Sequence, residues 1–251
     1  MTPPALPRCY PVDLRLPFLG AEGLMRLAQT CSWVRGHAAL VHGAGPGNLG
    51  LVLGLSTLGL AVTVADASAA QLETFKGAAG ARASGVELLP LDAPLQLPEG
   101  RFDVVFVDGR FGPSLESVAA SVRPALRRNG HLVAVCASRV GRGPPSGALG
   151  EYWERRTGTA LRPPRELLQR LERTGYEPQS VESLSDDGMG DAYQLLSAAL
   201  PLLDPAALVP FDAEVKAWRA AGPASVTLAF SLVVGRRKEP GEKPPAVRTA
   251  G

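Results

Sequence analysis

Three closely spaced glycines between two hydrophobic runs restrict the fold of this chain more than any other feature. The segment from Ala38 to Asp66 reads AALVHGAGPGNLGLVLGLSTLGLAVTVAD. It predicts a strand at 38–43, a glycine-rich turn, a buried helix at 48–59 and a second strand at 61–66. Such a turn brings backbone N–H groups at a helix N-terminus close to a ligand, and Asp66 stands where a pair of ribose hydroxyls would need an acceptor. We therefore expect a ligand that carries a nucleoside.

Strand and helix patterns alternate along most of the remaining chain. The run FDVVFVD is continuously apolar, as a parallel strand buried on both faces requires. This alternation predicts an α/β fold with a mostly parallel sheet and right-handed crossovers. We expect further strands at 86–89, 130–138, 176–183 and 224–235, and helices at 21–33, 68–77 with Ser68 as N-cap, 114–127, 164–174, 191–199 and 211–220.

The 251 residues suffice for one domain with additions. We place this domain at 37–235, after an irregular segment and helix at 1–36 and before a disordered tail at 236–251. A stretch rich in Gly, Pro and Arg at 139–163 is expected to form a loop or lid, and 184–212 an insertion.

Charge and cysteine content narrow the class of protein. The net charge of +2 gives no reason to expect nucleic acid, and the five basic and two acidic residues of the tail account for it. Cys9, Cys31 and Cys136 lack CxxC spacing, so we expect no disulfide framework, no metal site and a cytoplasmic location. The N-terminus lacks the apolar core of a signal peptide, and no apolar run is long enough to span a membrane.

The glycine turn matches more than one cofactor template. The dinucleotide pattern GxGxxG fits at Gly45, Gly47 and Gly50. The flavin spelling GAGPGG nearly fits from Gly43, with Asn48 in place of the last glycine. The turn by itself leaves the cofactor open.

Over residues 37–235 the order of motifs resembles the class I S-adenosylmethionine-dependent methyltransferase family. ALVHGAGPG stands in the place of the family's first motif and AVTVADAS in that of its second strand. LPLDAPLQLPEGRFDVVFVDG, VRPALRRNGHLVAVCAS and RELLQRLERTGYEP are similar to the segments that follow in the family. A flavin or nicotinamide enzyme would account only for the first two motifs.

The resemblance implies a Rossmann-like, mostly parallel seven-stranded sheet with helices on both faces and an antiparallel C-terminal strand. It implies S-adenosyl-L-methionine as cofactor, with Asp66 on the ribose hydroxyls and Asp92 on the adenine amino group. The complete set of cofactor-binding residues implied is Gly43, Ala44, Gly45, Gly47, Asp66, Ala67, Asp92, Ala93 and Asp108.

One position departs from the family pattern. Val41 stands where the family usually has an acid that anchors the methionine amino group of the cofactor, and His42 follows it. Asp108 or a backbone carbonyl would have to replace that contact. A non-catalytic descendant of the family, which binds a ligand without turnover, therefore stays open as an alternative.

Methyl transfer is an in-line displacement that depends mainly on proximity and alignment, so no catalytic triad is required, and we identify no catalytic residue. The resemblance implies a small-molecule acceptor, with O- or C-methylation favoured. The sequence VDGRFG lacks the proline-bearing tetrapeptide of amino-directed nucleic-acid methyltransferases. A flavin- or nicotinamide-binding oxidoreductase is the alternative enzyme class.

Candidate acceptor-binding residues lie in the expected lid. Arginines there could bind an anionic acceptor such as a carboxylate, or simply be solvated. Tyr152 and Trp153 could cover an apolar substrate or pin the lid to the core. The arginines are Arg139, Arg142, Arg155 and Arg156.

Overall fold

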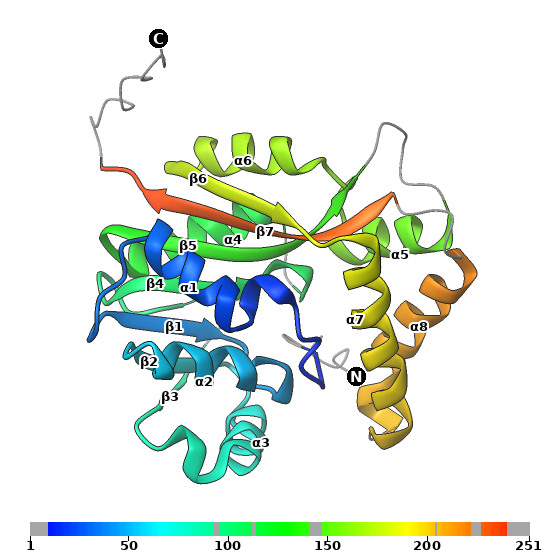
Figure 1. Cartoon of the computed structure of the whole chain (residues 1–251), viewed down its shortest axis with the longest axis horizontal. Coiled ribbons are helices and arrows are strands. Elements are labelled where there is room, and N and C mark those ends of the chain that lie inside the picture. The colour runs from blue at the N-terminus through cyan, green and yellow to red at the C-terminus, as the bar shows by residue number, and fades with distance from the viewer. Residues whose placement is uncertain are drawn as a thin grey trace.

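A computed structural model of the chain describes residues 10–92, 96–111, 114–140, 147–203, 205–221 and 227–239. Seven strands form one sheet in the order β3-β2-β1-β4-β5-β7-β6, with β7 antiparallel to both of its neighbours (Figure 1). The predicted fold class is confirmed. The strands are β1 Ala38–His42, β2 Ala61–Asp66, β3 Glu87–Pro90, β4 Phe102–Asp108, β5 Leu126–Arg139, β6 Tyr176–Ser183 and β7 Leu228–Arg237.

Helices cover both faces of the sheet, and a third group stands at the carboxyl ends of its parallel strands (Figure 1). One face carries α1 Ala21–Thr30, α2 Leu49–Thr57 and α3 Ala69–Ala79. The other carries α4 Leu115–Val122 and α6 Pro164–Arg173. The third group consists of α5 Ala148–Thr157, α7 Asp186–Ala199 and α8 Pro205–Ala221.

Strand β4 shows why the sheet is buried on both sides. Val104 and Phe106 belong to the hydrophobic core under α1 and α2, whereas Val105 and Val107 belong to the core under α4 and α6. Burying each such side chain, rather than leaving it in water, contributes about 1.5–3 kcal/mol to the stability of the folded chain. The prediction of a strand buried on both faces is confirmed.

The strand order reverses direction at β1, which pairs with β2 on one side and β4 on the other. In open α/β sheets, ligands bind outside the carboxyl ends of strands at such a reversal. The turn that follows β1 therefore lies where the topology places a binding site.

Some element boundaries differ from those predicted. Helix α5 lies inside the expected 139–163 loop, because Leu149 and Trp153 form a buried helical stripe that the flanking Gly and Pro residues obscure in the sequence. Helix α4 ends at Val122, ahead of Pro124, and the strand β5 begins at Leu126. Helices α7 and α8 begin earlier than predicted, at Asp186 after the capping Ser185 and at Pro205. Ser68 caps α3 as predicted.

The C-terminal strand β7 continues through Arg237, into the segment that we assigned to the tail. Residues 240–251 lie outside the described residues, as does Cys9. Cys31 and Cys136 are buried free thiols.

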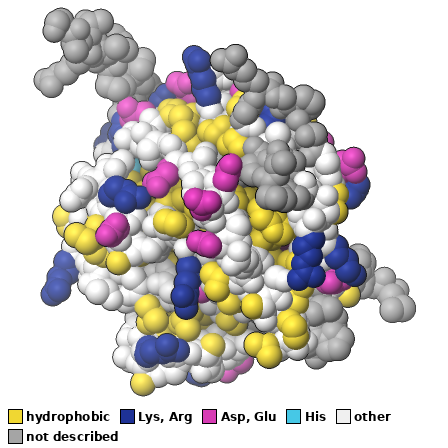
Figure 2. Space-filling model, turned by 45° about the vertical axis from the view of Figure 1, so that its right-hand side comes forward, with side chains coloured by type: hydrophobic (Ala, Val, Ile, Leu, Met, Phe, Trp, Pro, Cys, Tyr) yellow, Lys and Arg dark blue, Asp and Glu magenta, His cyan; other side chains and the backbone are white. Residues whose placement is uncertain are grey.

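None of the helices described here combines the length and apolarity needed to cross a membrane. Within the same residues, no three or more His, Cys, Asp or Glu side chains are grouped so that they could hold a metal ion. On the face that Figure 2 shows, acidic and basic side chains are interspersed with hydrophobic ones, so this face presents no extended patch of one sign.

Candidate functional site

The turn after β1 is held by backbone hydrogen bonds and by one carboxylate. Gly43 has φ +103°, a conformation that favours glycine, and its N–H donates to the Ala65 carbonyl at 2.8 Å. The Ala44 N–H donates to Asp66 Oδ2 at 2.9 Å, and the Ser68 N–H donates to Asp66 Oδ1 at 2.8 Å. Asp66 is 3% exposed. Its carboxylate thus ties the glycine turn to the start of α3.

The segment Tyr10–Gly20, the N-terminal strap, lies directly on this turn. The Gly47 N–H donates to the Tyr10 carbonyl at 3.0 Å, and a Cβ at Gly47 would lie 2.4 Å from that oxygen. A Cβ at Gly50 would lie 2.2 Å from Asp13 Oδ2. The bare backbone of these two glycines is therefore covered by the chain's own carbonyl and carboxylate oxygens.

Beneath the strap lies a cavity of about 330 Å³, between α1, the start of α2 and the sheet. Its floor is formed by β1, β4 and β5, with Val41, Phe106 and Val133 among the lining residues. Polar groups line it as well, from the turn, the end of β4 and the strap: His42, Asn48, Asp108, Arg110, Asp13 and Arg15.

Asp108 and Arg110 form a buried ion pair at the carboxyl end of β4. Arg110 donates from Nε to Asp108 Oδ1 and from Nη2 to Oδ2, both at 2.7 Å. The guanidinium carbon lies 4.5 Å from the ring centroid of Tyr10 and 4.4 Å from that of Phe230. Arg110 is only 4% exposed. One arginine thus joins β4, β7 and the strap.

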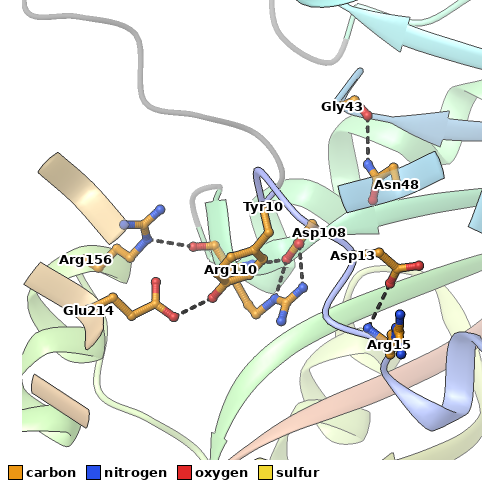
Figure 3. A network of polar contacts seen from close by, with 9 residues as sticks. All are labelled: Tyr10, Asp13, Arg15, Gly43, Asn48, Asp108, Arg110, Arg156 and Glu214. Carbon is orange, nitrogen blue, oxygen red and sulfur yellow. Dashed lines mark hydrogen bonds and ion pairs between the residues drawn. The ribbon is translucent and has the colours of Figure 1, made fainter. Parts of the chain in front are cut away.

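A second buried acid holds the strap from the side of α8 (Figure 3). The Tyr10 hydroxyl donates to Glu214 Oε1 at 2.6 Å, and Glu214 is fully buried. The Tyr152 hydroxyl lies 3.5 Å from Glu214 Oε2 and accepts from Arg156 Nη1 at 2.7 Å. Arg156 Nε also donates to the Arg110 carbonyl at 3.2 Å. The strap, α5 and α8 are therefore connected at this edge.

Burial raises the pKa of Glu214 to about 7, and the hydrogen bond from Tyr10 and the charge of Arg156 only partly offset this effect. Burial, followed by the charge of Glu214, raises the pKa of Tyr10 well above its ordinary value. Tyr10 therefore donates the hydrogen bond to Glu214 as a neutral phenol.

Three of the predicted cofactor residues line two separate hollows, and the other described ones line neither. Gly47 and Asp108 line the cavity beneath the strap. Asp92 is exposed and lines a separate surface hollow with Glu99 and Ser121. Asp66 lines neither, although the Leu91 N–H donates to its carbonyl at 3.0 Å and so keeps the ends of β2 and β3 together. Ala67 is exposed, Ala44 and Gly45 are buried, and Ala93 lies outside the described residues.

Val41, where the family pattern has an acid, is buried in the apolar core. We expected Asp108 or a backbone carbonyl to replace that acid. Asp108 is paired with Arg110, and the Gly43 carbonyl accepts from Asn48 Nδ2 at 2.7 Å. Both of these groups already have partners within the chain.

The lid residues have mixed placements. Trp153 is buried and donates from Nε1 to the Tyr193 hydroxyl at 3.2 Å, so it pins α5 to α7. Arg155 is exposed and pairs with Glu151 at 3.5 Å, whereas Arg156 packs over Phe111 at 4.8 Å. The backbone N–H of Arg139 donates to the Arg162 carbonyl at 2.9 Å. Arg142 lies outside the described residues.

Sequence reasoning missed Tyr10, Arg110 and Glu214, which build much of this site. Arg110 was visible only as part of a turn after β4, and Glu214 as one acid on a helix. Tyr10 and Glu214 are 204 residues apart in the chain, so no local pattern connects them. A tyrosine in a proline-rich segment was the only available signal.

No protein-family model and no curated protein sequence matches this chain. Solved structures do match. A methyltransferase from Geobacter sulfurreducens, solved with S-adenosyl-L-homocysteine, aligns with a TM-score of 0.66 and 16% identity over 91% of this chain and 93% of that one. Geranyl diphosphate methyltransferase in complex with SAM aligns with a TM-score of 0.59 and 19% identity over 92% and 98%.

The cyclase SpnF aligns comparably, with a TM-score of 0.65 and 16% identity over 94% of this chain and 87% of that one. At these identities the comparisons establish the fold. The chain has the fold of the class I methyltransferases, as its motif order predicted, and a cyclase shares that fold.

We expect Glu214 to make stability depend on pH. Its pKa is about 7 in the folded chain against an ordinary 4.5, so unfolding releases a proton between these values and stability falls as pH rises through this window. Relative to Glu214→Gln, the wild type should lose about 3 kcal/mol between pH ~4.5 and pH ~7. Urea unfolding across this range measures the difference.

The exposed Glu151→Gln provides the control and should keep the wild-type profile. If Glu214→Gln also has the wild-type profile, the buried carboxyl does not titrate as described.

We expect Gly47→Ala to loosen the strap. The new Cβ would meet the Tyr10 carbonyl, which is backbone and cannot move aside as a side chain would. Trypsin should then cleave after the exposed Arg15 several-fold faster than in the wild type. Gly77→Ala, in open space on α3, is the matched control and should leave the cleavage rate unchanged. Equal rates in both variants would contradict the close contact between strap and turn.

Proposed function

We propose that this protein transfers a methyl group from S-adenosyl-L-methionine to a small-molecule acceptor. The observation that carries the proposal is the placement of the glycine turn. It follows β1 at the reversal of the strand order, and its neighbour Asp66 ends β2. Several solved structures of this fold were obtained with SAM or S-adenosyl-L-homocysteine.

The sheet topology argues against the dinucleotide alternative. The usual dinucleotide-binding order is 3-2-1-4-5-6. Here β7 is inserted between β5 and β6 and runs antiparallel to both. A flavin or nicotinamide oxidoreductase therefore has support only from the glycine turn.

Two acids at neighbouring strand ends would hold the nucleoside half of the cofactor. Asp66 ends β2 and Asp92 follows β3, and the Leu91 N–H donates to the Asp66 carbonyl. Asp92 would take the adenine. Asp66 would take the ribose, although its buried carboxylate already accepts from the Ala44 and Ser68 N–H groups and would have to share these bonds. The methionine half would lie toward Gly47 and Asp108, where the strap now packs. The cofactor would therefore bind either beside the strap or after the strap has moved away.

When bound, the cofactor supplies an activated methyl group, and the chain's task is to hold the acceptor in line with it. Both carboxylate oxygens of Asp108 already accept hydrogen bonds from Arg110, so Asp108 is poorly placed to take a proton from the acceptor. An acceptor that is already anionic or strongly nucleophilic requires no base.

Non-catalytic binding is the second candidate. It is favoured by Val41 in place of the usual acid and by the partners that Asp108 and the Gly43 carbonyl already have. Calorimetry separates both of these candidates from a flavin or nicotinamide protein. Heat from S-adenosylmethionine and S-adenosylhomocysteine, but not from FAD or NADH, supports the cofactor of our proposal, and only methyl transfer from S-adenosylmethionine then distinguishes turnover from non-catalytic binding. Absence of heat from the first two at millimolar concentration refutes our proposal.

We expect Asp92→Ala to weaken binding of S-adenosylhomocysteine by roughly 5- to 150-fold, because the adenine amino group loses its acceptor. Asp92 is exposed, so thermal stability should not change. Glu99→Ala removes the same charge from the same hollow and should leave affinity intact.

Asp66→Ala should weaken binding by about 1–3 kcal/mol and, unlike Asp92→Ala, should also lower stability, because the Ala44 and Ser68 N–H groups lose their acceptor. Unchanged affinity in both variants would show that the nucleoside lies elsewhere.

A further inference from the structure

The cavity beneath the N-terminal strap is hydrophobic over most of its wall. Its lining is rich in aliphatic side chains that come from the strap, two helices and the sheet. A volume of about 330 Å³ lies at the lower end of the range for small-molecule sites. Representative aliphatic residues are Val12, Leu14, Leu16, Leu24, Leu51 and Val133.

Arg110 brings an incompletely bonded cation to this cavity. Its Nε and Nη2 atoms donate to Asp108, and the planar guanidinium places Nη1 at the corner away from that carboxylate. Nη1 is buried and has no hydrogen-bond partner among the residues described. A buried donor without an acceptor is unfavourable, so a ligand oxygen placed at this corner would be stabilised by it.

The charges around Arg110 favour an anionic oxygen. Asp108 balances Arg110, while Arg156 adds a second positive charge, and its Nη2 is likewise buried without a partner among the described residues. Glu214 is the other acid of this cluster, and its pKa is about 7. The groups that face Glu214 are Tyr10 from the strap, Tyr152 and Arg156 from α5, Tyr193 from α7 and Arg110.

We propose that this cavity binds a largely apolar small molecule ending in a carboxylate, with the carboxylate on Arg110 Nη1 and the hydrocarbon against the aliphatic wall. Charge-assisted hydrogen bonds from arginine to a carboxylate are stronger than those to neutral oxygens. Binding does not depend on the proposed function. Only the role of this ligand as methyl acceptor rests on that function.

The test uses the full-length protein with octanoate and octanamide, which share a hydrocarbon and differ in charge. Calorimetry at pH ~6 should give at least about tenfold tighter binding of octanoate. Equal affinity for the two, or no binding of octanoate, would overturn the proposal.

Two variants address the two halves of the site. Arg110→Lys keeps the charge but loses the planar donor, so the preference for octanoate should fall several-fold. Arg101→Lys is the matched control, because Arg101 also pairs with an acid, Glu87, and lies over a ring, that of Phe102, but does not line the cavity. Val133→Phe fills the cavity floor and should weaken both ligands, and it covers the case in which Arg110→Lys does not fold.

Acidity provides an independent readout. Protonation of Glu214 removes a negative charge near Arg110, so octanoate should bind more tightly at pH ~6 than at pH ~8, and Glu214→Gln should abolish the difference. Octanamide should bind equally at both values. A difference that persists in Glu214→Gln would contradict the charge argument.

A separate titration with S-adenosylhomocysteine keeps the two proposals apart. Octanoate binding without S-adenosylhomocysteine binding would refute the proposed function and leave this inference standing. Binding of S-adenosylhomocysteine without binding of octanoate would refute this inference and leave the proposed function standing. Direct competition between the two would show that Arg110 serves the cofactor, and would overturn the inference.

Discussion

The ion pair between Asp108 and Arg110 organises the carboxyl edge of the sheet. Arg110 lies within 4.5 Å of the Tyr10 and Phe230 rings, so it connects the strap to β7 as well as to β4. Its carbonyl accepts from Arg156 on α5. A buried charge is tolerated only when paired, so both partners must be in place before the strap and α5 can pack here. Both members of the pair line the cavity beneath the strap.

The sheet supplies the second constraint. Because β1 has β2 on one side and β4 on the other, the glycine turn, Asp66 and Asp108 all come to one edge although they are spread over the sequence. The strap is tied to the same edge, because the Gly47 N–H donates to the Tyr10 carbonyl.

The parts predictable from sequence were those with a local cause. The continuous apolar run of β4, the Ser68 cap and the glycine turn each depend on neighbouring residues. Helix α5 was not predicted because its buried stripe, Leu149 and Trp153, is short and flanked by Gly and Pro. The pairing of Tyr10 with Glu214 joins residues 204 positions apart, and neither residue has a pattern that points to the other.

The glycines themselves illustrate a limit of motif reading. A glycine-rich turn after a strand is usually interpreted as space left for a ligand, and here Tyr10 and Asp13 fill that space at Gly47 and Gly50. They do so with a carbonyl and a carboxylate, the same kinds of oxygen that a cofactor with a carboxylate would offer. A ligand that displaces the strap therefore exchanges one set of acceptors for another, with little net gain in hydrogen bonds. Its affinity must come from what the strap lacks, a nucleoside that reaches toward Asp66 and Asp92.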